Sequence, residues 1–98
     1  MNKIDNLLNL PLSTRLKKSE NVPWRIIEGE AILVNVDKSE VIHLNQTAAE
    51  VWNHLDNKNA ILDIITHIQE KFEIDEEIAK KDILEFISQL VEKGLVTE

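Results

Sequence analysis

The spacing of the apolar residues changes at Asn45, and this change constrains the fold more than any other feature of the sequence. Residues 31–36 are rich in β-branched side chains, and residues 40–44 form a second short segment, rich in apolar residues, after a polar turn, as is typical of strands. From residue 48 onward the apolar positions recur three and four residues apart, which is the period of a helix. A block of strands followed by a block of helices predicts an α+β domain.

The strand block predicts a three-stranded antiparallel meander. Residues 22–27 lead into a turn at Gly29, residues 31–36 form the next strand, and residues 40–44 follow the polar turn at residues 37–39. We expect one face of this sheet to be well buried and the other partly buried. In the last strand, Ile42 and Leu44 share one face, and Val41 and His43 share the opposite one.

The helix block predicts three amphipathic helices. Asn45 is placed to cap the first, of about ten residues, and the second carries an isoleucine stripe that ends at Phe72. The third runs from Asp75 to Lys93 and is closed by Gly94. Leu84 and Val91 fall beside its main apolar stripe, so we expect a second, partly apolar shoulder. Three helices on a small sheet predict a winged-helix-like arrangement.

Length and composition predict one domain behind a tail. The chain has 98 residues, which suffices for one hydrophobic core, and we expect a flexible tail at residues 1–21 and a folded domain at residues 22–98. The tail contains the apolar segment Leu7–Leu12, which could lie on a sheet edge, compete with a ligand or clasp a homodimer; simple disorder is the alternative.

Several function classes are disfavoured by what the sequence lacks. The chain has no cysteine, and the two glycines are 65 positions apart, so no thiolate zinc site and no glycine-rich phosphate loop is expected. No residue pattern singles out a catalytic group, and we expect no enzyme activity and no cofactor. A net charge of −7 disfavours nucleic acid, and the absence of long apolar runs disfavours membranes. A cytoplasmic location is the simplest expectation.

The aromatic, histidine and acidic residues have structural and functional interpretations. Trp52 lies in the first helix's apolar stripe and is expected in the core, with Trp24 partly exposed. His43 is either a groove residue or a surface residue. His54 and His67 have no ligand spacing and are interpreted as surface histidines, so no metal site is expected. The acidic run at residues 73–77 lacks the spacing of an EF-hand loop.

Three quarters of the chain resembles a known family. The strings "WRIIEGEAILVNVDKSEVIHLNQTAAEVW", "ILDIITHIQEKFEID" and "DILEFISQLVEKGLV" are similar to those of the PqqD-like family, the recognition elements for ribosomally made, post-translationally modified peptides. The most specific pieces are "HLNQTAAEVW" at residues 43–52 and the closing "L(x)3GLV" at residues 90–96. The resemblance lies in the order and spacing of these motifs and leaves residues 1–21 outside.

The resemblance implies a non-catalytic, chaperone-like module that binds the leader of a precursor peptide as an added β-strand. Its partners would be that leader and a modifying enzyme of the radical, cyclase or protease type. The implied site pairs the third strand with one side of the third helix. Its expected residues are Glu40, Val41, Ile42, His43, Leu44, Lys80, Lys81, Leu84, Ile87 and Ser88.

Two other functions are compatible with the same predicted strands and helices. A winged-helix DNA-binding protein would read the major groove with its third helix, but residues 75–93 contain six acidic residues against three lysines. A generic adaptor for a folded protein is the second alternative, and the sequence contains nothing that separates it from a leader-binding module.

Overall fold

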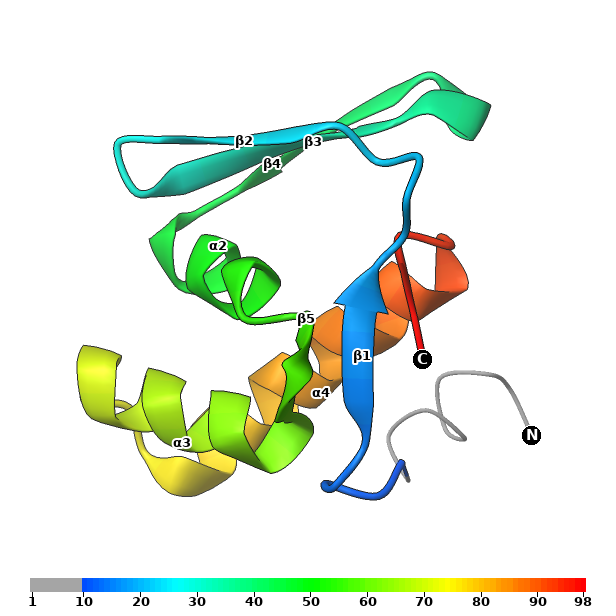
Figure 1. The fold of residues 1–98 in the computed structure, drawn as a ribbon. Coiled ribbons are helices and arrows are strands. Elements are labelled where there is room, and N and C mark those ends of the chain that lie inside the picture. Colours follow the sequence, from blue (N-terminus) through cyan, green and yellow to red (C-terminus); the bar gives the residue numbers. More distant parts are fainter. Residues whose placement is uncertain (1–9) are drawn as a thin grey trace.

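Over the described part of the chain, the fold consists of three helices and two small antiparallel sheets (Figure 1). The structure is a computed structural model, and it describes residues 10–98. The strands are β1 (Arg15–Lys18), β2 (Trp24–Ile27), β3 (Glu30–Asn35), β4 (Glu40–Leu44), β5 (Asp56–Ala60) and β6 (Val96–Thr97); the helices are α2 (Gln46–Asn53), α3 (Ile61–Phe72) and α4 (Glu76–Glu92), with a 3-10 turn η1 at Val36–Lys38. The predicted α+β class is confirmed.

The first sheet has the order β2-β3-β4 and is the meander that the sequence predicts. Ile27 pairs with Glu30 across a two-residue turn, in which Glu28 and Gly29 have φ angles of 53° and 83°. Two positive φ angles are what a type I′ hairpin turn requires, and glycine adopts them without steric cost. Leu33 pairs with Ile42 on the other side, so β4 continues the meander.

This sheet is buried on one face only. Ala31 and Leu33 are fully buried, and the alternate residues Ile32 and Val34 are half-buried. Figure 1 shows the sheet as a layer above α2, with α3 below that helix. The expectation of one well-buried face and one partly buried face is therefore confirmed.

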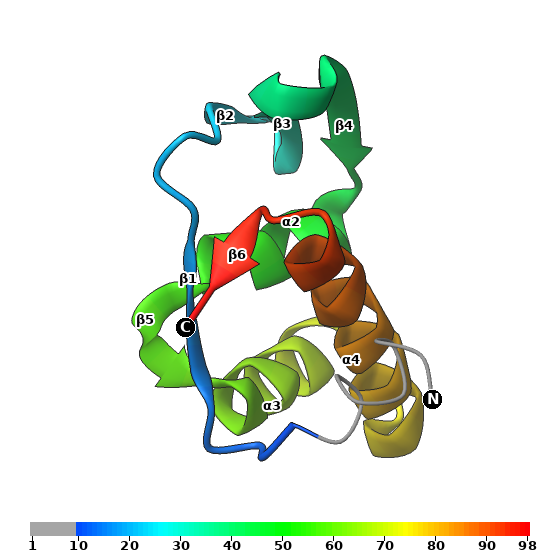
Figure 2. The ribbon, with the colours of Figure 1, turned by 90° about the vertical axis from the view of Figure 1, so that its right-hand side faces the viewer.

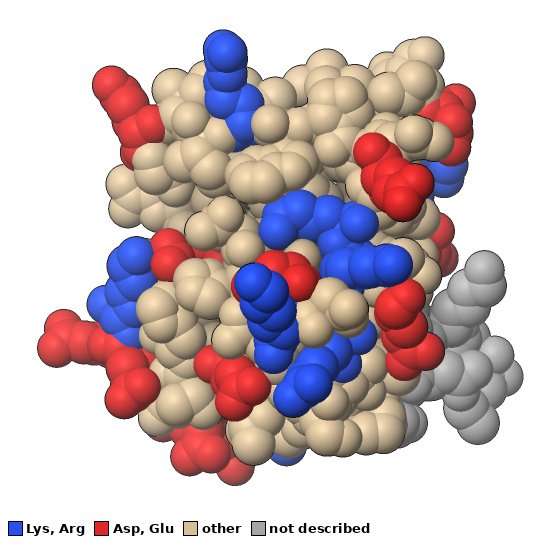
Figure 3. All heavy atoms as spheres, viewed as in Figure 1, with Lys and Arg blue, Asp and Glu red and all other residues tan. Residues whose placement is uncertain are grey.

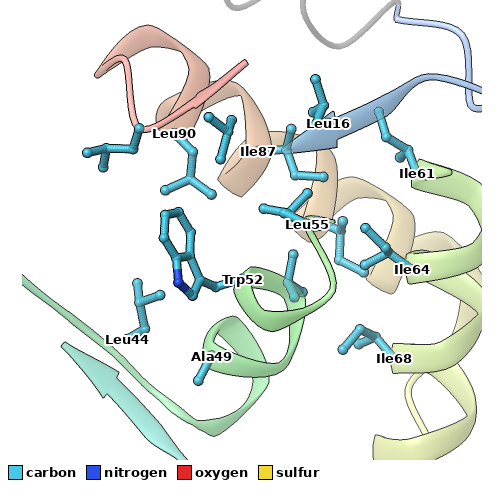
Figure 4. Packing of buried hydrophobic residues seen from close by; sticks show 14 of the residues in the cluster. Leu16, Leu44, Ala49, Trp52, Leu55, Ile61, Ile64, Ile68, Ile87 and Leu90 are labelled. Atoms are coloured by element: carbon cyan, nitrogen blue, oxygen red, sulfur yellow. The ribbon is translucent and has the colours of Figure 1, made fainter. Parts of the chain in front are cut away.

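Helix α2 begins at the predicted cap and brings Trp52 to the centre of the core. The Asn45 Oδ1 accepts a hydrogen bond from the Ala48 backbone N–H at 2.9 Å. Trp52 has no exposed surface and lies between Leu44 on β4 and Leu90 on α4 (Figure 4). A side chain of this size therefore joins the sheet, α2 and α4 in one hydrophobic cluster.

The other two helices also follow the predicted stripes. The isoleucines of α3 at positions 61, 64, 65 and 68 are all buried. At the end of α4, the N–H of Gly94 donates to the carbonyl of Val91 at 3.0 Å and that of Leu95 donates to Leu90 at 2.9 Å. These two bonds make a Schellman motif, with Gly94 in the left-handed region at φ 74°. None of the described helices has the length and hydrophobicity needed to cross a bilayer.

The second sheet, of order β5-β1-β6, was not predicted. The expectation of a flexible tail through residue 21 is wrong at Arg15–Lys18, which form the central strand, with Leu16 only 2% exposed. Residues 56–60 lie between two of the predicted helices and form β5. Leu7 and Leu8 lie outside the described residues, and Leu10 and Leu12 pack partly buried against the core.

Lys18 holds β1 against the end of α2. Its Nζ donates to the carbonyls of Asn53 at 3.3 Å and Leu55 at 3.2 Å, where the negative end of the helix favours a cation. The same Nζ lies 5.1 Å from the ring centre of Trp24 and 5.5 Å from that of Trp52. Partial burial lowers the pKa of Lys18.

Trp24 is 41% exposed, whereas Trp52 is buried. The predictions of a partly exposed Trp24 and a core Trp52 are therefore confirmed.

Candidate functional site

Strand β4 has a free edge, because within residues 10–98 it pairs with β3 alone. The N–H of Val34 in β3 donates to the carbonyl of Pro23, on the β2 side, at 2.9 Å. Backbone groups alternate between the two neighbours along an antiparallel strand, so Val41, which pairs with Val34, directs its N–H and C=O away from β3. His43 does the same two residues later. These two residues present the hydrogen-bonding groups of the open edge.

The side chains of β4 point to the two faces of the sheet. Leu44 is buried and Ile42 is half-buried, whereas Val41 is 70% exposed. The Nε2 of His43 lies 3.0 Å from the Glu30 Oε1 on the outer face, and the His43 side chain is 61% exposed. The side chain of His43 is therefore at the surface, while its backbone lies on the open edge.

Two hollows lie where α4 approaches the two ends of β4. The larger, of about 340 Å³, is mostly apolar in its lining and contains residues from α2, α4 and the segment before α4: Asn45, Thr47, Ala48, Val51, Ile74, Asp82, Ile83 and Phe86. The smaller, of about 230 Å³, is lined by Lys38, Gln89, Glu92 and Lys93. The first can accept an apolar side chain, and the second offers mainly charged and polar groups.

One flank of α4 lies beside β4. Asp82, Phe86, Gln89 and Lys93 are spaced four, three and four residues apart, which places them on a single stripe of the helix. The Nζ of Lys93 lies 3.1 Å from a carboxylate oxygen of Glu40, the first residue of β4. We call the four residues of this stripe the β4-facing flank.

The predicted helix residues lie on other parts of α4. Leu84 is 8% exposed, and Ile87 and Ser88 are 1% exposed, so these three are buried. Ser88 donates its hydroxyl hydrogen to the carbonyl of Glu85 at 2.8 Å. Lys80 and Lys81 are exposed. The expectation that Leu84 lies on a partly exposed shoulder is therefore wrong.

The N-terminal segment and β6 lie near the expected shoulder of α4, which is buried at Leu84 and half-buried at Val91. Val91, the other residue of the expected shoulder, shares a hollow of about 570 Å³ with Leu10, Leu16 and Val96. Figure 2 shows β6 between β1 and the C-terminal end of α4. The apolar residues beside the main stripe therefore make packing contacts with other parts of the chain, which the sequence analysis did not predict.

Comparison with known families gives the identity of this fold. A family model described as coenzyme PQQ synthesis protein D (PqqD) matches residues 30–96. The chain belongs to the PqqD family. The matched segment contains β3, β4 and all three helices, so it contains the open edge and the β4-facing flank. The resemblance noted from the sequence motifs is confirmed.

Two solved structures have the same fold as this PqqD-family chain. TbiB1, solved in complex with the TbiA(beta) leader peptide, has a TM-score of 0.74 and 21% identity, over 82% of this chain and 93% of that one. The PqqD truncation of Methylobacterium extorquens PqqCD, described as a functional and stand-alone RiPP recognition element, has a TM-score of 0.73 and 19% identity, over 95% and 99%. No curated protein sequence matches the chain.

The sequence of this PqqD-family member contains one signal for the β4-facing flank that our prediction passed over. Phe86 is half-buried at the margin of the apolar stripe, where a large side chain borders polar residues on both neighbouring turns. Ile74, from the short connection before α4, lines the same hollow. Such marginal apolar residues could have been proposed for the site, but the sequence does not say which flank lies next to β4.

The two histidines interpreted as separate surface residues are neighbours. The ring centres of His54 and His67 are 4.3 Å apart, and their side chains are 27% and 39% exposed. The carboxylate of Glu50 lies beside both rings, and it also accepts a hydrogen bond from the Lys71 Nζ at 2.9 Å. This bond from Lys71 lowers the pKa of Glu50 despite its partial burial. The pairing of α2 with α3 brings these residues together from distant positions in the sequence.

Proposed function

We propose that this chain is a non-catalytic module that binds the leader of a precursor peptide and presents it to a separate modifying enzyme. The guest adds as a strand to the open edge of β4 and lies along α4. The observation that carries the proposal is this free edge beside the apolar hollow at the end of β4. Membership of the PqqD family supports it, as does the leader peptide bound by TbiB1, a protein of the same fold.

Backbone pairing alone does not account for useful affinity. Val41 and His43 offer four backbone groups, each worth about 1 kcal/mol net when bonded. About 4 kcal/mol corresponds to roughly millimolar binding, before the entropy of ordering a flexible peptide is subtracted. The guest therefore needs apolar contacts in addition to its added strand.

The hollow between α2 and α4 provides such a contact. Ala48, Val51, Ile74, Ile83 and Phe86 contribute apolar surface to it. Burial of one leucine-sized or phenylalanine-sized side chain there would add about 1.5 to 3 kcal/mol. We expect a leader in which one bulky apolar residue reaches this hollow, while the residues paired with Val41 and His43 vary freely because their backbones make the bonds.

The charge distribution disfavours the winged-helix DNA-binding alternative. Its recognition helix would be α4, where acidic residues outnumber basic ones six to three over residues 75–93. Basic residues do gather on β1, as Arg15, Lys17 and Lys18, and Figure 3 shows a basic patch near the middle of that face with acidic side chains around it. This basic group therefore belongs to the second sheet and not to the helix that would have to enter the groove.

A matched pair of proline substitutions tests strand addition. Val41→Pro removes an N–H from the open edge of β4 and leaves the bonds between β3 and β4 intact. Ile26→Pro does the same on the opposite edge, at β2, because Ile26 pairs with Ala31, whose groups face β4. We expect Val41→Pro to weaken binding of the cognate leader at least tenfold and Ile26→Pro to leave it unchanged, in calorimetric titrations of variants whose folding is verified by thermal unfolding.

Backbone amide shifts recorded during the same titration locate the guest. We expect the largest changes at Val41, His43, Ala48 and Phe86. Equal losses of affinity in both proline variants, or shifts centred on β1 and β6, would contradict strand addition to β4.

A further inference from the structure

Glu50, His54 and His67 form a compact cluster on the surface where α2 meets α3. One nitrogen or oxygen atom from each of the three side chains lies within 4.8 Å of those of the other two. The Nε2 of His67 is 3.1 Å from the Glu50 Oε1, and the Nδ1 of His54 is 3.8 Å from the same oxygen. Two imidazoles and one carboxylate are a ligand set that zinc uses in proteins.

A hydrogen bond to the backbone orients one of the two imidazoles. The Nδ1 of His54 lies 2.9 Å from the carbonyl oxygen of Glu50, and it must carry the proton to donate to that oxygen. The Nε2 of His54 then keeps its lone pair. In metal sites, one ring nitrogen of a histidine ligand commonly donates to a carbonyl or carboxylate while the other binds the ion.

We propose that Glu50, His54 and His67 bind a divalent ion of the zinc type, which clamps α2 to α3. Bonds of about 2.0 to 2.1 Å in a tetrahedral site place ligand atoms about 3.3 Å apart, so the cluster must contract by side-chain rotation. The three side chains are 21% to 39% exposed, which leaves them room to rotate. The Nε2 proton that His67 shares with Glu50 moves to its Nδ1, and water completes the coordination.

Lys71 competes with the ion for Glu50. Its Nζ donates to the Oε2 of Glu50 at 2.9 Å, while the Oε1 faces the histidines. The carboxylate is thus already partly neutralised, and removal of the ammonium should strengthen metal binding. Glu50, His54 and His67 are not among the residues that line the apolar hollow, so the metal site is separate from that hollow and does not depend on leader binding.

Titration of the full chain with Zn²⁺ tests the site. We expect one ion per chain in calorimetry, a rise in the thermal unfolding midpoint that a chelator reverses, and a visible Co²⁺ spectrum of the four-coordinate type. His54→Gln and His67→Gln should each weaken Zn²⁺ binding at least tenfold. The control is His43→Gln, which removes the third histidine, 61% exposed and paired with Glu30, and should leave the affinity unchanged.

Two further variants test the role of Glu50. Glu50→Gln should weaken Zn²⁺ binding, and Lys71→Met should strengthen it, because the carboxylate loses its competing cation. The absence of Zn²⁺ binding to the wild-type chain, an octahedral Co²⁺ spectrum, an affinity that depends on His43, or an unchanged affinity in Lys71→Met would each overturn the proposed site.

Discussion

The two flanks of α4 differ in the parts of the molecule that lie next to them. The β4-facing flank borders two hollows and carries Phe86 half-buried. The opposite flank carries Leu84, which is buried in the core cluster, and Val91, which lines a hollow with Leu10, Leu16 and Val96. A leucine beside the main stripe of a helix therefore does not by itself indicate a ligand site, because the core can bury it.

The two sheets differ in how their strands are connected along the chain. In β2-β3-β4, the last strand leaves Val41 and His43 with free backbone groups. In β5-β1-β6, the strand that comes from the N-terminal segment is the central one and has a neighbour on each side. The N-terminal segment thus joins residues 56–60 to residues 96–97, and of the two open edges of the first sheet, at β2 and β4, the one at β4 adjoins the apolar hollow.

Leu84→Asp gives the largest expected effect on this comparison. The side chain is 8% exposed, so the substitution buries a carboxylate without a partner and removes apolar contacts. We expect a loss of about 3 to 5 kcal/mol in the free energy of unfolding, measured by denaturant titration. Gln89→Asp, at an exposed position of the β4-facing flank, should change it by less than about 0.5 kcal/mol. A stable Leu84→Asp variant would show that the flank of α4 that carries Leu84 can open to solvent.

Leu16→Ala tests whether β1 is part of the folded domain. Leu16 is 2% exposed, and the truncation should cost about 2 to 4 kcal/mol of unfolding free energy. Lys17→Ala is the control, because its side chain points outward from the same strand and should cost less than about 0.5 kcal/mol. Equal and small effects in both variants would indicate that the N-terminal segment is dispensable for stability.

The first sheet and the three helices could be predicted because their burial follows a local period. Leu33 alternates with half-buried neighbours, and the isoleucines of α3 repeat at helical spacing. Gly29 and Gly94 mark a turn and a helix end at positive φ angles. Each of these signals is contained within a few residues, so reading one segment at a time recovers it.

The second sheet could not be predicted, because its strands are short and pair over long distances. Lys17 pairs with Asp56 on one side and Thr97 on the other. Strand β5 begins with the polar sequence DNKN, which is typical of a turn, and β6 has only two residues. The same limit explains why the site was only partly predicted. β4 was predicted correctly as a strand, but the choice of the flank of α4 that lies beside it depends on long-range contacts.

Phe86→Ala tests the open flank directly. The substitution removes an aromatic wall of the apolar hollow, and we expect at least a tenfold loss of affinity for the cognate leader, equivalent to about 1.4 kcal/mol. Phe72→Ala is matched to it, because Phe72 is also half-buried on the surface of the core but does not line the hollow. The two variants should lose similar stability, and only Phe86→Ala should lose affinity for the leader. A loss of affinity in Phe72→Ala alone would mean that the leader does not bind along this flank of α4.

The ion pair between Glu40 and Lys93 gives the smallest expected effect. Their side chains are 39% and 38% exposed, so solvent screens the 3.1 Å contact between α4 and the start of β4. A double-mutant cycle with Glu40→Gln and Lys93→Met should give a coupling below about 1 kcal/mol, and it should shrink as salt is added. Only a pair shielded from water reaches a coupling above about 2 kcal/mol that resists salt. Such a result would mean that this contact closes the space between β4 and the β4-facing flank. In that case the open flank would be partly sealed, and leader binding should tighten when the pair is removed.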